Sequence, residues 1–230
     1  MLWFINNLLN LLKDRSDKYR LCTTNQRPYT MTNKLFGLRE KKMAQAKTLT
    51  DRELKKVLNF ISCHKHAARN RAMLLTTHWS GMRVGEVAAL LIGDIMNTDG
   101  TIKSEVLLLA EQTKGKHARA VFISDKLRKE LATYLSFINT SDLTKPLFYT
   151  QKRAGFSANT LTQHFHWLYK QAGIAGASSH SGRRSFITAL ASKGVGVRVL
   201  MALAGHRNIS TTQAYIDVND EMKRAAVELI

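Results

Sequence analysis

Cysteine and long hydrophobic runs are scarce in this chain of 230 residues. The two cysteines, Cys22 and Cys63, lie far apart and outside any C-x-x-C pattern, which excludes a disulfide framework and a cysteine zinc site. The most apolar run, residues 2–12, is interrupted by asparagines and is too short to span a bilayer. It also lacks the cationic start of a signal peptide. We therefore expect a protein of the reducing cytoplasm with no membrane partner.

Acidic side chains are also few. The chain has 35 Lys and Arg against 17 Asp and Glu, giving a formal net charge of +18 and a pI near 10.2. This balance predicts a polyanionic partner, and nucleic acid leads the candidates, ahead of a ribosomal partner or a basic surface that only aids solubility. The candidate motifs contain no paired carboxylate cluster, so a two-metal nuclease mechanism finds no ligands. We expect no metal and no other cofactor.

The chain divides into two parts of different character. Residues 1–48 comprise an apolar head and a basic stretch with little periodicity, and we interpret them as an irregular N-terminal extension. Met43 offers an alternative start, so residues 1–42 are either an appendage or an over-extended reading frame. Residues 49–230 are expected to form one globular domain, since 44% of the chain is hydrophobic.

The pattern of this domain is mostly helical. A capping box at Thr50 and Glu53 opens the first helix. Periodicity predicts further helices near 68–79, 84–91, 125–138, 158–171, 181–193 and 196–204, and an amphipathic tail over 217–230. Two segments rich in Val, Leu and Ile, 105–110 and 118–123, flank a turn at 114–117 that is typical of a hairpin tip. The fold class predicted is α+β, with a small antiparallel sheet.

Two basic motifs stand at helix starts, where backbone N–H groups favour an anion. Arg83 opens one helix, and the alternative is a surface ion pair with Glu86 one turn on. His180 and Arg183, in His-Ser-Gly-Arg-Arg, open another, and a solvated basic cluster is the alternative there. Each motif alone predicts little more than a possible phosphate contact.

Two further residues follow the last strong helix. His206 stands in Gly-His-Arg, where an imidazole can simply cap carbonyl groups. Tyr215 ends Thr-Thr-Gln-Ala-Tyr and could equally be a half-buried core tyrosine. Only the order and spacing of the whole set predict a specific function for these residues.

That set resembles the catalytic domain of the tyrosine recombinase (phage integrase) family. Arg83 with Glu86, a hairpin lysine, His-x-x-Arg and Gly-His-x-x-x-x-Thr-Thr-x-x-Tyr occur in the family's order between about residues 49 and 225. The resemblance implies a site-specific DNA recombinase that acts on double-stranded DNA as a homotetramer, with accessory recombination proteins, in the nucleoid. It implies the catalytic residues Arg83, Lys114, His180, Arg183, His206 and Tyr215, with Glu86 supporting the first arginine.

The chemistry of these side chains agrees with the implied roles. A tyrosine can attack a phosphodiester, and two planar guanidinium groups suit its non-bridging oxygens. His206 can add a third donor, and His180 can accept the tyrosine proton. Lys114 is preferred to Lys116 as general acid because residues 111–114 end the first strand, where the family places its lysine.

The sequence departs from the family pattern in places. Ser181 and Gly182 occupy the middle of His-x-x-Arg, and Arg184 replaces a frequent histidine. Family members also carry a helical core-binding domain of about a hundred residues before the catalytic domain, in place of an irregular extension. Two alternatives therefore stay open: a type IB topoisomerase-like enzyme, and a truncated, catalytically impaired relative that only binds DNA.

Overall fold

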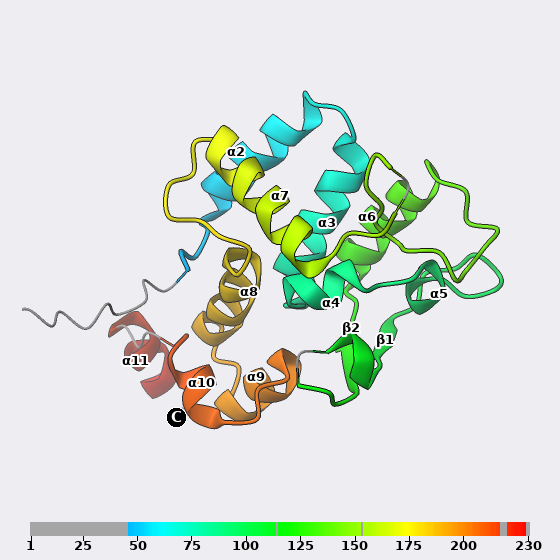
Figure 1. Ribbon diagram of the computed structural model, residues 1–230. Coiled ribbons are helices and arrows are strands. Elements are labelled where there is room, and N and C mark those ends of the chain that lie inside the picture. Colours follow the sequence, from blue (N-terminus) through cyan, green and yellow to red (C-terminus); the bar gives the residue numbers. More distant parts are fainter. Residues whose placement is uncertain (1–45, 114, 153, 217–219, 229–230) are drawn as a thin grey trace, which may run out of the picture. The chain divides into compact units, whose positions relative to one another are not determined.

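The computed structural model describes residues 46–113, 115–152, 154–216 and 220–228. The chain divides into two units, residues 1–44 and 45–230, and the predicted extension lies outside the described residues as far as residue 45. None of the helices in these ranges is long and apolar enough to cross a membrane. The elements are α2 (Asp51–Ser62), α3 (Ala67–Ser80), α4 (Val84–Ala88), α5 (Ile92–Ile95), β1 (Glu105–Leu108), the short 3₁₀ helix η2 (Ala110–Gln112), β2 (Arg119–Phe122), α6 (Asp125–Leu135), α7 (Ala158–Gln171), α8 (Ser181–Ser192), α9 (Val197–Ala204), α10 (Ile209–Gln213) and α11 (Asp220–Val227) (Figure 1).

The predicted α+β class is confirmed, with one correction among the helices. The helix predicted over 84–91 ends at Ala88. Beyond it, Leu90 O accepts a hydrogen bond from Leu147 N at 2.8 Å, and Ile92 N donates to Lys145 O at 2.9 Å. Tertiary pairing with the segment before α7 thus replaces the helical hydrogen bonds there. Two other elements end earlier than predicted. The helix predicted over 125–138 ends at residue 135, and the strand predicted over 105–110 ends at residue 108.

The two strands form an antiparallel hairpin in which Val106 faces Val121 and Leu108 faces Arg119. Val106, Leu108 and Val121 are buried, so this face of the hairpin is turned toward the core. Because alternate residues of a strand share a face, Arg119 lies on the same side as Val121. A charged side chain is therefore directed inward from β2.

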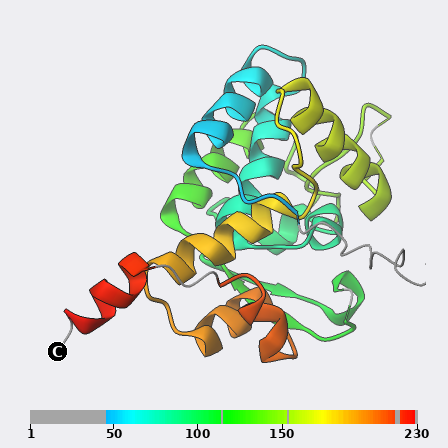
Figure 2. The same cartoon turned by 90° about the vertical axis from the view of Figure 1, so that its left-hand side faces the viewer.

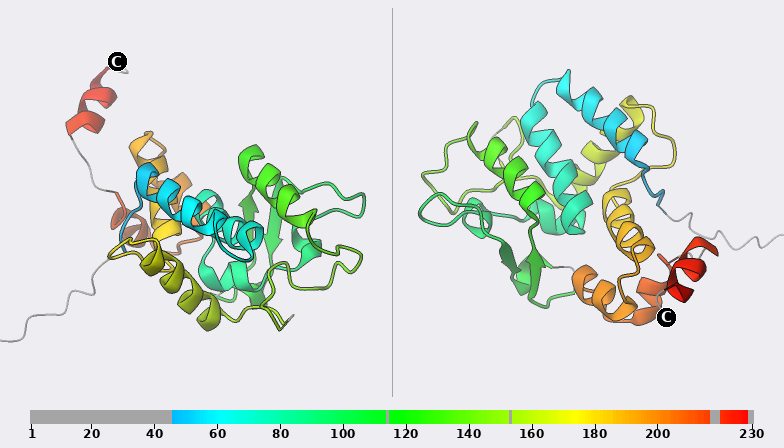
Figure 3. Two further views of the ribbon diagram at one scale, coloured as in Figure 1. Left: turned by 90° about the horizontal axis from the view of Figure 1, so that it is seen from above. Right: turned by 180° about the vertical axis from the view of Figure 1, so that it is seen from behind.

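Helix α8 lies between two groups of elements. Figure 2 shows it crossing below α2, α3 and α7 and above the hairpin, α9 and α10. Seen from behind, the hairpin, α9 and α10 lie together (Figure 3, right). Helix α3 packs along α8 so closely that a Cβ atom at Gly182 would stand 2.3 Å from Thr77 Oγ1. The glycine in the His-Ser-Gly-Arg-Arg motif is thus required by this close approach.

A buried polar cluster joins α3 to α7. Arg69 is only 8% exposed, and it donates to Asn70 Oδ1 through Nε at 3.3 Å and Nη2 at 3.0 Å. His164 Nε2 lies 3.0 Å from the same oxygen. Burial and the Arg69 charge lower the pKa of His164 to about 4, so this imidazole is uncharged at neutral pH. A single neutral oxygen therefore hydrogen-bonds both the buried Arg69 and the partly buried His164.

Replacing Asn70 by Asp is expected to stabilise the domain. The carboxylate would make charge-assisted hydrogen bonds to Arg69, and the free energy of unfolding should rise by about 1–2 kcal/mol at neutral pH. Urea denaturation measures this change. Asn70→Leu, which removes the acceptor, should instead be destabilising, and a loss of stability in Asn70→Asp would contradict the interpretation.

Candidate active site

The first arginine is held by the helix that it precedes. Arg83 is the N-cap of α4, and its backbone N–H donates to Glu86 Oε2 at 2.7 Å. Its guanidinium donates through Nη1 to Glu86 Oε1 at 2.8 Å and through Nη2 to Gly205 O at 3.1 Å. The ion pair weighed as an alternative to a phosphate contact is therefore present. Since it engages only part of the guanidinium fork, it orients Arg83 and leaves further N–H groups to bind an anion.

Glu86 has a second arginine partner that the sequence reasoning missed. Arg119 donates to Glu86 Oε2 through Nη2 at 2.7 Å and to Leu203 O through Nη1 at 3.0 Å. Burial alone would raise the pKa of Glu86, which is 1% exposed. The hydrogen bonds and charge of Arg119, together with the hydrogen bonds from Arg83, outweigh burial and hold the pKa below its usual value. The strand alternation places Arg119 on the buried face of the hairpin, and this pattern could have predicted the contact, because a buried charge requires a partner.

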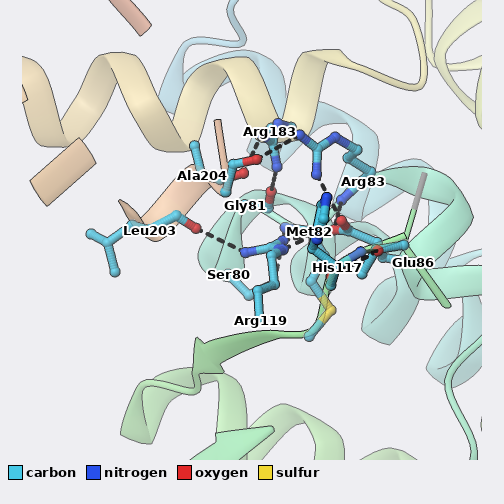
Figure 4. A network of polar contacts seen from close by, with 12 residues as sticks. Ser80, Gly81, Met82, Arg83, Glu86, His117, Arg119, Arg183, Leu203 and Ala204 are labelled. Atoms are coloured by element: carbon cyan, nitrogen blue, oxygen red, sulfur yellow. Dashed lines mark hydrogen bonds and ion pairs between the residues drawn. The ribbon is translucent and has the colours of Figure 1, made fainter. Parts of the chain in front are cut away.

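The second arginine of the predicted set is the more deeply buried. Arg183 is 3% exposed and donates to Gly81 O at 2.7 Å and to Ala204 O (Figure 4). Burial, together with the neighbouring charge of Arg83, lowers the pKa of Arg183 to about 9, which leaves the guanidinium charged at neutral pH. The arginine that opens α8 is thus fixed between the end of α3 and the end of α9.

Three consecutive carbonyl groups at the end of α9 accept hydrogen bonds from these three arginines. The carbonyls of residues 203, 204 and 205 accept from Arg119, Arg183 and Arg83 in turn. The last carbonyls of a helix lack intrahelical partners and carry the negative end of its dipole, so they suit guanidinium donors. Gly205 has φ +61°, and a Cβ atom there would stand 2.6 Å from Arg119 Cδ. Both the turn and the packed arginine therefore require glycine.

This turn places His206 beside Tyr215. His206 Nδ1 lies 2.9 Å from Thr212 Oγ1 in α10, which fixes the ring orientation. The His206 and Tyr215 rings stack with their centroids 5.7 Å apart. Burial and the charges of Arg183, Arg83 and Arg119 lower the pKa of His206 to about 4. The imidazole is therefore a neutral hydrogen-bonding group at neutral pH, and Tyr215 is half-buried against it.

A cavity of about 580 Å³ opens beside this cluster, between the hairpin turn and the loop after α9. Arg83 and His206 line it, and Gly115 and His117 line it from the hairpin side. Arg183 and Tyr215 are not among the residues that line it: Arg183 is buried, and the Tyr215 ring stacks on His206. An anion in this cavity would contact Arg83 and His206 directly. The His206 ring would separate it from the Tyr215 ring.

Of the two remaining predicted catalytic residues, the structure describes only His180. Lys114 falls outside the described residues, and the residue before it, Thr113, donates through Oγ1 to His117 O at 2.9 Å. His180 precedes α8, three residues before Arg183, with Nδ1 3.4 Å from Ser179 Oγ. Within the described ranges no group of three or more His, Cys, Asp or Glu side chains could hold a metal ion.

The electrostatic balance of the cluster favours an anion. Arg83, Arg119 and Arg183 contribute three positive charges, and Glu86 contributes one negative charge, leaving two positive charges in a largely buried site. Such a site is electrostatically unfavourable when empty and gains strongly from a bound polyoxyanion. The cluster therefore favours an anion such as a phosphate group in the cavity lined by Arg83 and His206, and the Tyr215 ring stacks on His206.

Arg119→Met should destabilise the domain by removing one guanidinium from the buried carboxylate. We expect a loss of about 2–3 kcal/mol in the free energy of unfolding. Adding Glu86→Gln should then cost less than it does in the unsubstituted protein, since the two residues interact directly. Arg198→Met, on the exposed side of α9, is the matched control and should change stability by less than about 0.5 kcal/mol. Equal effects of the two arginine substitutions in urea denaturation would contradict the assigned contact.

Known proteins share both the sequence pattern and the fold. The phage integrase family matches residues 47–222. Tyrosine recombinase XerA of Pyrococcus furiosus is 31% identical over 185 residues, which cover 79% of this chain and 61% of the relative. The crystal structure of XerA recombinase matches with a TM-score of 0.64 at 26% identity, over 80% of this chain and 64% of that chain.

A more distant solved structure has the same fold. The Tn1549 transposon integrase in complex with transposon right end DNA matches with a TM-score of 0.63 at 17% identity, over 80% of this chain and 66% of that chain. The chain spans less than two thirds of the length of the XerA protein that it matches. The resemblance inferred from the motifs is confirmed: the chain belongs to the phage integrase family.

Proposed function

We propose that this chain is a site-specific DNA recombinase that breaks and rejoins strands through a 3′-phosphotyrosine bond at Tyr215. The observation that carries the proposal is the gathering of Arg83, Arg183, His206 and Tyr215 at the end of α9, beside a cavity that can admit a phosphate. Membership of the phage integrase family and similarity to XerA, a named tyrosine recombinase, support it.

Double-stranded DNA is the proposed substrate. The chain carries a net charge of +18, which favours a polyphosphate. The structure of a protein with the same fold, the Tn1549 transposon integrase, was solved with DNA. We further propose that the active form is a homotetramer on DNA, assisted by accessory recombination proteins, in the nucleoid of the cytoplasm.

The first chemical step is attack on the phosphorus atom. The Tyr215 oxygen forms the new P–O bond while its proton passes to His180, and negative charge develops on the non-bridging oxygens. Arg83 and Arg183 bind these oxygens through N–H groups that are not engaged by Glu86 and the carbonyl groups. His206, neutral at neutral pH, adds one further hydrogen bond.

The second requirement is a proton for the departing oxygen. As the bond from phosphorus to the 5′ oxygen breaks, Lys114 protonates that oxygen, and the DNA remains joined to Tyr215 through its 3′ phosphate. The phosphotyrosine retains the energy of the broken phosphodiester. A 5′-hydroxyl from a second strand can therefore reverse the reaction without ATP, which gives strand exchange.

Covalent capture tests the proposal without knowledge of the target sequence. The protein is incubated with labelled, sheared DNA from its own source in EDTA, and protein-linked DNA is precipitated from dodecyl sulfate and sequenced. We expect adducts that resist denaturation, converge on one sequence and form in the presence of chelator. DNA that binds but never becomes linked would support the binding-only alternative, and adducts that require added magnesium would contradict the arginine-based mechanism.

Strand exchange separates the recombinase from the topoisomerase-like alternative. A supercoiled plasmid with two copies of the captured sequence should yield recombinant circles. Relaxation of the plasmid without recombinants would favour the topoisomerase-like activity.

A further inference from the structure

Arg184 contacts the proposed nucleophile but belongs to none of the roles assigned above. Its guanidinium carbon lies 5.3 Å from the centre of the Tyr215 ring, in cation–π geometry. Its Nε donates to Thr48 Oγ1 at 3.1 Å. The side chain is half-buried, and no ion pair joins it to a carboxylate of the described residues. Its charge is thus directed at the tyrosine ring.

The helix separates Arg184 from its neighbour Arg183. Consecutive residues of an α-helix point about 100° apart, so the two side chains leave the helix in different directions. Arg183 is turned toward the ends of α3 and α9, where it donates to Gly81 O. Arg184 is turned toward Thr48 and Tyr215. Arg183 is therefore hydrogen-bonded within the arginine cluster, whereas Arg184 lies over the Tyr215 ring.

Thr48 is itself well anchored. Lys47 N donates to Gly176 O at 3.3 Å, and Leu49 N donates to the Ser185 hydroxyl at 2.7 Å. Leu49 is buried in the core. The residues on both sides of Thr48 are therefore fixed on the loop before α8 and on α8 itself, so Thr48 can hold Arg184 in one orientation.

Among the described residues, Tyr215 has three further contacts, one of which is the hydrogen bond from its backbone N–H to Thr212 O at 3.0 Å. Its ring stacks on His206, and its carbonyl accepts a hydrogen bond from Thr188 Oγ1 at 3.3 Å. Tyr215 follows the short helix α10, which has only five residues. A phenol at such a place can rotate unless side chains hold it, and an attacking oxygen misplaced by about 1 Å loses roughly a hundredfold in rate.

We propose that Arg184 is a positioning residue that holds the Tyr215 ring for attack, and that Thr48 fixes Arg184 in turn. The inference rests on the proposed function, since it assigns a role in the tyrosine step. It extends that function to a residue outside the arginine cluster, and to the segment that leads into α2. Arg184 touches the nucleophile and does not contact the phosphate.

Single-turnover cleavage of a nicked duplex that carries the captured sequence tests the proposal. Arg184→Met keeps side-chain length but removes the charge and the Nε donor, and it should slow adduct formation by roughly 10- to 100-fold. Arg184→Lys retains the charge and should recover part of the rate. Thr48→Val should slow the reaction less than Arg184→Met does, and Thr48→Ser, which keeps the hydroxyl, should match the unsubstituted protein.

The salt dependence of DNA binding distinguishes positioning from a phosphate contact. If Arg184 holds Tyr215, the affinity of Arg184→Met and its slope against salt concentration should equal those of the unsubstituted protein. If Arg184 binds a phosphate, the slope should fall by about one and the affinity should weaken, which would overturn the proposal. Urea denaturation of each variant establishes whether a lost rate reflects only lost folding.

A second readout needs no DNA. Nitration of Tyr215 by tetranitromethane, followed by peptide mass spectrometry with Tyr149 as internal reference, should be several-fold faster in Arg184→Met because the ring is no longer held. Unchanged nitration together with an unchanged cleavage rate overturns the proposal and leaves the proposed function standing. Absence of adducts from the unsubstituted protein overturns both.

Discussion

Tyr215→Phe abolishes covalent adducts and leaves DNA binding intact: this is the result expected if Tyr215 is the nucleophile. The substitution deletes one oxygen and keeps the ring that stacks on His206 at 5.7 Å. The affinity for the captured duplex should therefore stay within about threefold, since the ring still packs on the same side chains and no phosphate contact is removed. Gel shift measures binding, and dodecyl sulfate gels measure the adduct.

Tyr149→Phe is the matched control. Tyr149 is half-buried on the segment between α6 and α7, and its carbonyl, which accepts from Arg69 Nη1, is unaffected by the substitution. This variant should form adducts at the rate of the unsubstituted protein. Adducts from Tyr215→Phe would place the nucleophile elsewhere and refute the central proposal.

Lys114→Ala should slow cleavage by about 10²- to 10⁴-fold, the usual contribution of a positioned proton donor. Replacing the bridging 5′ oxygen of the substrate by sulfur supplies a leaving group that needs no proton. The sulfur substrate should therefore restore most of the rate of Lys114→Ala and none of the rate of Tyr215→Phe. Single-turnover rates with the two substrates give the comparison directly.

The nearby Lys116 supplies the control for this assignment. Lys116 follows Lys114 by two residues in the sequence and has a left-handed backbone at φ +51°. Lys116→Ala should cleave the ordinary substrate at close to the normal rate. If sulfur rescues Lys116→Ala and not Lys114→Ala, the mechanism stands and the general acid is Lys116.

The sequence alone predicted the fold class and most of the elements. The capping box at Thr50 and the apolar spacing after it predict α2, and both halves of the box are present, with Glu53 N donating to Thr50 Oγ1 at 3.2 Å. Signals of this kind are local, because a cap involves only residues within one turn. The helix predicted through residue 91 was wrong because residues 90–92 pair with residues 145–147, and local periodicity contains no information about such a contact.

The order and spacing of the motifs also predicted which side chains carry the chemistry, and that assignment stays a prediction. The sequence could not determine how these side chains are held, because the contacts join residues far apart in the chain. Arg83 meets Gly205, Arg119 meets Glu86 and Arg184 meets Thr48 only after folding. The partners are a carbonyl, a carboxylate and a hydroxyl, and no local pattern pairs the carboxylate of Glu86 with Arg119 or the hydroxyl of Thr48 with Arg184. The tertiary structure alone decided that three carbonyls at the end of α9 collect three arginines, because buried guanidinium groups must find acceptors wherever the fold supplies them.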